Sequence, residues 1–181
     1  YFIKAPNYIP KKKINYLLPN DYIYFHYKED IISRLSWNLD DIKIFFDEIL
    51  KFHKNIIFTR DIGQKFNKND IVNHFQYYDF KKNQIFNKDK DHRIILFENI
   101  EGVDLYNTII NAKKILAFHG MMTNLGSLNK KEIIDMWFCD INNWDDYRNY
   151  RNAFYEFKPI YEGYNFIIPS RNMKKTIKKI R

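Results

Sequence analysis

The chain has 181 residues, of which 45% are hydrophobic and 18% aromatic, and this is enough to build the core of one ordinary domain. No apolar run reaches the roughly 20 residues that cross a bilayer, and the single cysteine excludes an internal disulfide and a cysteine cluster for zinc. The chain begins at Tyr1 and shows no secretory leader. We therefore expect a reducing, cytoplasmic setting and an upstream part beyond this sequence.

The net charge of +8 is concentrated at the carboxyl end of the chain. Residues 171–181 hold six basic side chains and no acidic one, which leaves +2 on the rest of the protein. A basic surface with a recognisable motif is the signature of nucleic-acid binding. Since the charge lies in a tail and no such motif is visible, we expect no nucleic-acid partner. The five histidines have no metal-like spacing, so we also expect no metal.

Three segments differ in composition along the chain. Residues 1–20 contain three prolines and a run of three lysines without sustained periodicity, which indicates a linker or arm. Residues 21–170 alternate between short β-rich runs and amphipathic patterns, and we interpret them as one domain. Residues 171–181 form a basic terminal helix in which Met173, Ile177 and Ile180 share one face.

The element order in the central segment predicts the fold class. Asn38 is typical of a helix N-cap, and we expect Asp104 to cap a second helix. Residues 26–37 and 64–92 show no strong hydrophobic periodicity. The expected strands are 22–25, 56–58, 93–97, 115–118, 133–137 and 164–168, and the expected helices are 39–54, 104–112, 121–128 and 144–157. Strands that alternate with helices predict an α/β domain with a Rossmann-like parallel sheet flanked by helices.

The unit from Ile115 to Trp137 is interpreted as strand, tight turn, helix and strand. The strand stops at His119 and Gly120, and the next helix presents unpaired backbone N–H groups and the positive end of its dipole there. Such a turn binds anions, and Thr123 and Asn124 add a hydroxyl and an amide to the first helical turn. The alternative is a structural turn with no ligand, which is common in α/β proteins.

Polar side chains gather just past the other predicted strands, at the edge where ligands bind in open parallel sheets. Lys28 and Arg60 would neutralise a diphosphate, and Glu98 or Glu101 would accept hydrogen bonds from ribose or sugar hydroxyls. The alternative is that strand ends are polar because they meet water. The polar residues at this edge are His26, Lys28, Thr59, Arg60, Asp61, Glu98, Glu101 and His119, with Gly120 beside them.

The segment from Asn99 to Trp137 resembles the donor half of GT-B glycosyltransferases of the polysaccharide-building kind. The similarity is to an HGAGLTN-type motif, and the heptosyltransferase-like group has a comparable turn. Met121 and Met122 stand where that motif has small residues. The residues that carry the resemblance are His119, Gly120, Thr123, Asn124 and Leu125.

The resemblance implies one half of a GT-B fold, a Rossmann-like domain that binds a nucleotide-sugar while an amino-terminal domain binds the acceptor. The implied activity is transfer of a sugar to a cell-surface polysaccharide or a lipid-linked glycan precursor, with the nucleotide-sugar as donor substrate and no cofactor. By position, His26, Asp61 and His119 are candidates for the general base. The alternative is a non-catalytic module that binds a nucleotide or a glycan.

Two readings of the basic tail remain open. The terminal helix packs its apolar face on the domain and leaves its lysines in solvent, or those lysines contact the anionic inner leaflet of a membrane. The two are compatible, because a docked helix still presents its lysines outward. Peripheral attachment of this kind would place the protein near a lipid-linked acceptor.

Overall fold

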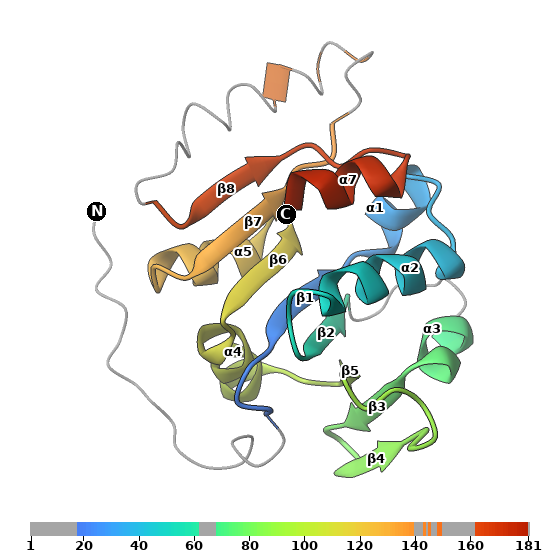
Figure 1. The fold of residues 1–181 in the computed structure, drawn as a ribbon. Helices are drawn as coiled ribbons and strands as arrows, with labels where there is room; N and C mark the ends of the chain where they lie inside the picture. Colours follow the sequence, from blue (N-terminus) through green and yellow to red (C-terminus); the bar gives the residue numbers. More distant parts are fainter. Residues whose placement is uncertain are drawn as a thin grey trace.

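The computed structural model describes residues 18–61, 68–139, 143, 145, 148, 149 and 162–180. Within these ranges the chain forms one open, eight-stranded sheet with helices on both faces (Figure 1). The predicted α/β fold with a Rossmann-like parallel sheet is confirmed. Residues 1–17 of the arm expected over residues 1–20, and most of the helix expected over residues 144–157, lie outside the described residues.

The described elements largely alternate between strands and helices along the chain, although α1 and α2 follow one another and β3, β4 and β5 come in succession. Their bounds are β1 Ile23–Tyr27, α1 Glu29–Arg34, α2 Leu39–Leu50, β2 Ile56–Arg60, α3 Lys68–His74, β3 Gln76–Asp79, β4 Gln84–Phe86, β5 Ile94–Glu98, α4 Gly102–Asn111, β6 Lys114–Phe118, α5 Met121–Leu128, β7 Glu132–Met136, β8 Tyr164–Ile167 and α7 Met173–Ile180.

The strand order is β4-β3-β5-β2-β1-β6-β7-β8, and all neighbouring pairs are parallel except β3 with β4. Without the β3–β4 hairpin, the order is that of the doubly wound dinucleotide-binding fold. The chain first builds outward from β1 through β2 to β5, then returns to the other side of β1 with β6. The direction of winding therefore reverses between β1 and β6.

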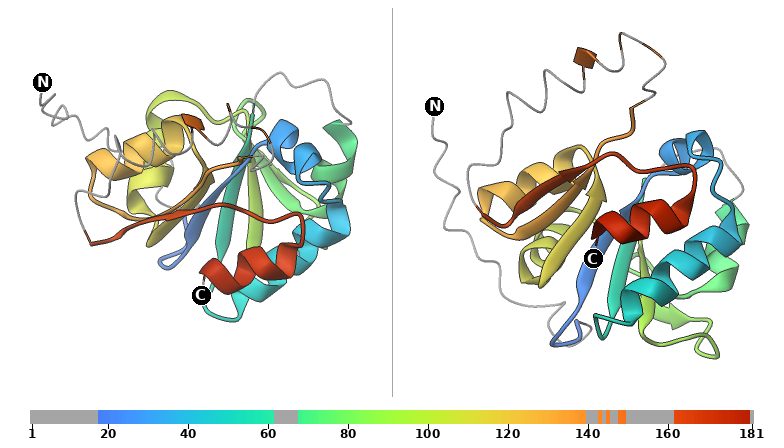
Figure 2. Two further views of the ribbon diagram at one scale, coloured as in Figure 1. Left: turned by 90° about the horizontal axis from the view of Figure 1, so that it is seen from above. Right: turned by 45° about the horizontal axis from the view of Figure 1, so that its top comes forward.

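Two hydrophobic clusters fill the spaces on either side of the sheet. One cluster joins the sheet to α1, α2, α3 and α7, and the other joins it to α4 and α5. Seen from above, α2 and α7 lie on one side of the sheet and α4 and α5 on the other (Figure 2). Alternating strand residues contribute to the two clusters, as the period of two in a β-strand requires. In β1, Phe25 belongs to the first cluster and Tyr24 to the second.

Helix α2 shows why these residues form this element. The Asn38 side chain accepts from the Asp41 N–H while the Asp41 carboxylate accepts from the Asn38 N–H, a capping box. Phe45 and Phe46 are fully buried, and their rings lie 5.7 and 5.4 Å from the ring of Phe25. Each such ring contributes about 1.5–3 kcal/mol by leaving water. The predicted N-cap is confirmed.

Some element boundaries differ from the sequence expectation. Helix α4 begins at Gly102 with Glu101 as the N-cap residue, so the assignment of the cap to Asp104 was wrong. A short helix, α1, follows β1 where no element was expected. The hairpin of β3 and β4 was also missed, in a stretch that is rich in Lys and Asn. Strands β1 and β2 run two residues further than predicted, so His26 and Thr59 lie inside strands.

Helix α7 is part of the domain core rather than an appendage. Met173 and Ile177 are buried in the cluster that contains α2, and Thr176 is fully buried. The Trp37 indole donates hydrogen bonds to the carbonyl oxygens of Ser170 and Arg171, 3.1 and 3.2 Å away, which ties the segment before α7 to the α1–α2 connection. The packing reading of the tail holds, and no helix in the described part of the chain has the length and apolar composition needed to cross a bilayer.

Candidate functional site

The reversal between β1 and β6 brings two loops together at the carboxyl edge of the sheet. Strand β1 ends at Tyr27 and is followed by Lys28, while β6 ends at Phe118 and is followed by His119 and Gly120. In open α/β sheets, ligands bind in the crevice outside such a reversal. The fold therefore places the His119-Gly120 turn, which the sequence singled out, at the position where this architecture most often holds a ligand.

Gly120 makes the turn and lies against Lys28. Its φ of 152° and ψ of −152° fall in a region that is essentially restricted to glycine. The Lys28 ammonium donates to the His119 carbonyl oxygen at 2.8 Å, and a Cβ on Gly120 would lie only 2.9 Å from Lys28 Nζ. The ammonium group is therefore held directly beside the first turn of α5.

The first turn of α5 divides its side chains between the core and the surface. The Thr123 hydroxyl donates to the Gly120 carbonyl oxygen at 2.9 Å and is fully buried, so it stabilises the turn itself. Asn124 is exposed, and the exposed fraction of Met121 is 60%. Met122 packs in the core on the α4 and α5 side of the sheet. Of the two methionines, only Met121 therefore flanks the helix N-terminus.

His119 is bonded to a carboxylate that the sequence analysis did not single out. Its Nδ1 lies 2.8 Å from Asp135 Oδ2, and the Tyr164 hydroxyl donates to the same oxygen at 2.5 Å. The ring centroids of His119 and Trp137 are 3.9 Å apart. The sequence signal for this cluster is the acidic residue inside the apolar run of β7, on the face that it shares with Ile133.

His26 belongs to a second histidine–carboxylate pair on the same side of the sheet. Its Nδ1 lies 2.9 Å from Thr59 Oγ1 and its Nε2 lies 2.9 Å from Asp61 Oδ1. Tyr24 OH lies 2.5 Å from Thr59 Oγ1, and burial raises the Tyr24 pKa well above its usual range, so the phenol stays protonated. The His26 side chain is 5% exposed against 28% for Asp61, so Asp61 is the member that reaches the surface.

Arg60 is not brought to the Gly120 turn. Its guanidinium bonds the carboxylates of Glu98 and Glu29, and its Nη1 lies 3.5 Å from Glu29 Oε1. Alternation along β2 places Arg60 on the α2 side of the sheet, the side opposite to Thr59. Burial raises the pKa of Glu29, although Arg60 opposes this shift. The carboxylates of Glu29 and Glu98 therefore already neutralise the charge of Arg60, which we had expected to neutralise a diphosphate.

The two glutamates expected to bind a sugar hydroxyl lie in different settings. Glu98 ends β5 and bonds Arg60. Glu101 is exposed and precedes α4 as its N-cap residue, but its side chain makes no cap hydrogen bond with that helix. Of these two glutamates, Glu101 is therefore the residue whose carboxylate faces solvent at the carboxyl edge of the sheet. Among the described residues, no three His, Cys, Asp or Glu side chains gather as a metal site.

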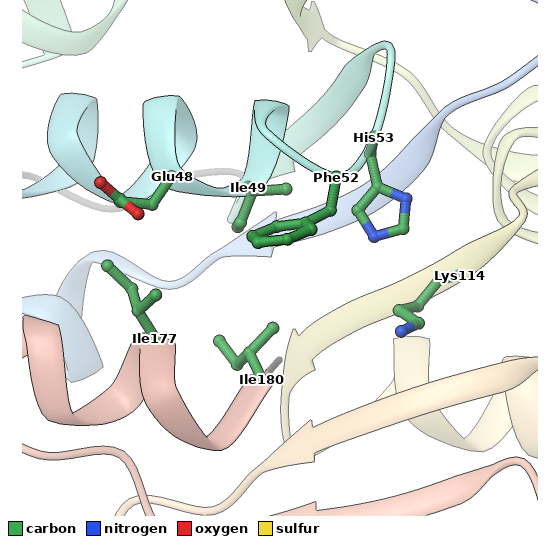
Figure 3. Close-up of a pocket in the computed structure, with 7 residues that line it drawn as sticks. All are labelled: Glu48, Ile49, Phe52, His53, Lys114, Ile177 and Ile180. Carbon is green, nitrogen blue, oxygen red and sulfur yellow. The ribbon is translucent and has the colours of Figure 1, made fainter.

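A cavity of about 240 Å³ lies away from this edge, between α2, α7 and the start of β6 (Figure 3). Its lining is largely apolar, and the Lys114 ammonium there pairs with Glu132. Burial lowers the pKa of His53 in the same cavity, which keeps that ring neutral. These groups do not suit a diphosphate. The cavity is lined by Glu48, Ile49, Phe52, His53, Lys114, Ile177 and Ile180.

Together, the doubly wound sheet and the glycine turn at its reversal define a Rossmann-like α/β protein with a candidate anion site at the carboxyl edge. Comparisons with known proteins found no match, whether to a family model, a curated protein or a solved structure.

Proposed function

We propose that this chain is the nucleotide-sugar-binding domain of a glycosyltransferase, with the donor diphosphate at the turn between β6 and α5. One observation carries the proposal: the Lys28 ammonium lies against Gly120, at the N-terminus of α5, where the winding of the sheet reverses. A fixed cation beside backbone N–H groups and the positive end of a helix dipole is complementary to a phosphate.

The nucleoside would extend from this turn across the sheet edge toward β5. Strands β6 and β5 are separated by β1 and β2, so their ends are three strand spacings, roughly 14 Å, apart. Glu101 follows β5 and presents an exposed carboxylate, which accepts hydrogen bonds from ribose hydroxyls. Arg60 and Glu98 bond each other, so we assign them to holding β2 and β5 together rather than to the ligand.

The chemistry follows from where charge develops. As the bond between the sugar and the diphosphate breaks, the leaving diphosphate gains negative charge, which Lys28 and the start of α5 would stabilise. The acceptor hydroxyl attacks the anomeric carbon and loses its proton to a general base. Asp61 and His119 remain candidates for that base, whereas both ring nitrogens of His26 are engaged inside the protein. The acceptor class, a cell-surface polysaccharide or lipid-linked glycan precursor, rests on the resemblance alone.

Calorimetric titration with a panel of nucleoside diphosphates tests the phosphate site. Lys28→Met removes one charge-assisted contact of about 1.5–3 kcal/mol and should weaken binding at least tenfold. The matched control is Lys54→Met, which neutralises an exposed lysine at the opposite edge of the sheet and should bind like the parent. Equal affinities in the parent and Lys28→Met would place the phosphate elsewhere.

The competing function is a module that binds the nucleotide without transferring a sugar. The two are separated by incubating the full-length protein with the nucleotide-sugar it binds and with lipid-linked acceptors, and by following release of the nucleoside diphosphate. Saturable binding with no release in the presence of any acceptor would favour the binding module.

We also propose that α7 contacts an anionic membrane surface. Lys174, Lys175 and Lys178 are exposed on the helix whose apolar side is buried against the domain, and each basic residue near such a surface contributes about 1 kcal/mol. Substituting all three lysines with Glu reverses their charges and leaves the buried apolar side of α7 unchanged. This variant should lose its salt-sensitive co-sedimentation with anionic liposomes, and equal partitioning of parent and variant would exclude this role.

A further inference from the structure

The cavity between α2 and α7 has the size and the lining of a site for an apolar group. Its volume of about 240 Å³ exceeds the roughly 150 Å³ of an apolar cavity that takes up benzene. Ile49 and Ile177 are buried in its wall, and Phe52 and Ile180 face each other across it (Figure 3). A ring or a chain of methylene groups that enters the cavity therefore leaves water.

Phe52 connects this cavity to a second hollow. The residue follows α2, and 61% of its surface is exposed. Phe52 and His53 line both the cavity and an open groove that passes the amino ends of β2 and β5. Burial lowers the pKa of His53, so the ring stays neutral where the two hollows meet. A ligand in the cavity can therefore extend past Phe52 into the groove.

The groove is basic, in contrast to the cavity. Lys51, Lys54 and Arg93 line it, and none of the described residues in its lining is acidic. Lys51 pairs with Glu48, and Arg93 pairs with Asp91. Lys54 is exposed and makes no ion pair with any residue that the structure describes. An anionic group in the groove therefore meets the Lys54 ammonium without displacing a carboxylate.

We propose that the cavity and the groove together bind an amphiphile that has one apolar chain and an anionic head, with the chain between α2 and α7 and the head beside Lys54. The surface presents an apolar cavity, an exposed ring and a cation in the same order as the parts of such a molecule. This site lies at the amino edge of the sheet and does not rest on the proposed function. The amphiphile is either free in solution or a lipid of the membrane that the exposed lysines of α7 would contact.

A methyl NMR titration of the full chain, labelled at isoleucine, locates the apolar chain of the ligand. The probes are hexanoate, octanoate and decanoate below their micelle concentrations, with acetate and octanol as controls. The Ile177 and Ile180 signals should shift saturably while the Met121 signal stays in place. Affinity should rise about fourfold with each methylene that the cavity covers. Octanol should bind more weakly than octanoate, and acetate should not bind.

Two results of this titration would overturn the inference. One is octanoate binding that shifts other methyl signals and leaves those of Ile177 and Ile180 unchanged, because the chain would then lie elsewhere. The other is equal affinity for octanol and octanoate, because the head would then make no contact with a cation.

Variants at two exposed positions test the ring and the cation separately. Phe52→Ala should weaken octanoate binding about tenfold by uncovering the chain. Lys54→Met should weaken it about two- to fivefold, as expected for an exposed ion pair, and should remove the preference for octanoate over octanol. The matched control is Lys81→Met, which neutralises an exposed lysine outside both hollows and should bind like the parent. Unchanged octanoate affinity in both Phe52→Ala and Lys54→Met would overturn the inference.

Co-sedimentation with phosphatidylglycerol vesicles distinguishes the two sources of the amphiphile. Octanoate binding together with equal vesicle partitioning of the parent and Phe52→Ala identifies a free amphiphile. No octanoate binding, together with a loss of vesicle binding in Phe52→Ala, identifies a membrane lipid. If octanoate does not bind and Phe52→Ala partitions like the parent, the inference is wrong. Neither variant should change nucleoside diphosphate binding, so this site and the proposed function can fail independently.

Discussion

At the scale of single residues, Gly120 combines a backbone requirement with a contact requirement. Its conformation strains any other residue by about 1–3 kcal/mol, and a Cβ would displace the Lys28 ammonium. We expect Gly120→Ala to lower the free energy of unfolding by this amount and to abolish nucleoside diphosphate binding. Chemical denaturation and calorimetry measure the two effects.

The control for Gly120→Ala is another glycine of the same helix. A Cβ on Gly126 would lie 2.4 Å from Ile115 Cδ1, so Gly126→Ala overpacks α5 against the sheet and should cost about 1–3 kcal/mol. The N-terminal turn is untouched, and binding should persist. Loss of binding in both variants to the same degree would mean that stability, rather than the turn, controls affinity.

Glu29 gives the pH dependence expected at this scale. Because burial raises its folded-state pKa, the favourable contribution of the protonated group is complete below the unfolded value of 4.5 and is lost as pH rises through the folded-state pKa. Glu29→Gln imitates the protonated form and leaves Glu98 paired with Arg60. The variant should gain stability relative to the parent as pH rises from 4.5 to 7 in denaturant titrations. If Glu29→Gln instead loses stability relative to the parent as pH rises from 4.5 to 7, the pairing of Glu29 with Arg60 outweighs the effect of burial.

At the scale of elements, α7 is stabilised by its buried side and not by its charges. Ile177 is 6% exposed in the cluster that includes α2, so Ile177→Ala should lower the free energy of unfolding by about 2–5 kcal/mol. Lys178→Ala alters only an exposed side chain and should stay within about 0.5 kcal/mol of the parent. Denaturant titrations of the two variants compare them directly, and similar losses would mean that α7 does not pack as described.

The elements also show what local sequence can predict. Helix α5 was predicted with its observed bounds because a glycine turn precedes it and apolar residues recur at helical spacing. Helix α1 was missed because six residues with one buried side chain, Ile32, carry too little periodicity. The β3–β4 hairpin was missed because it depends on pairing with β5, which no local pattern encodes.

The contacts of the candidate site also differ in whether the sequence could predict them. The approach of Lys28 to Gly120 follows from topology alone, since both lie just beyond adjacent parallel strands. The pairing of Arg60 with Glu29 and Glu98 could not be read from local sequence, because those partners are 31 and 38 residues away in the chain. Asp135 was missed for a different reason, because it lies within the buried, otherwise apolar part of β7, where the pattern predicts a core strand.

At the scale of the whole molecule, we predict one nucleotide site at the reversal of the sheet, remote from the cavity between α2 and α7. Two of the four methionines of the chain lie near these two regions and can serve as NMR probes for them. Met121 is 60% exposed beside the proposed phosphate site, whereas Met173 is buried in α7. Their methyl groups can be followed by NMR in the unmodified sequence.

The most direct test is a methyl NMR titration of the full chain with a panel of nucleoside diphosphates. We predict that at least one of them shifts the Met121 signal saturably while the Met173 signal stays in place. A saturable shift at Met173 without one at Met121, or no shift at Met121 with any member of the panel, would contradict a nucleotide site at the Gly120 turn.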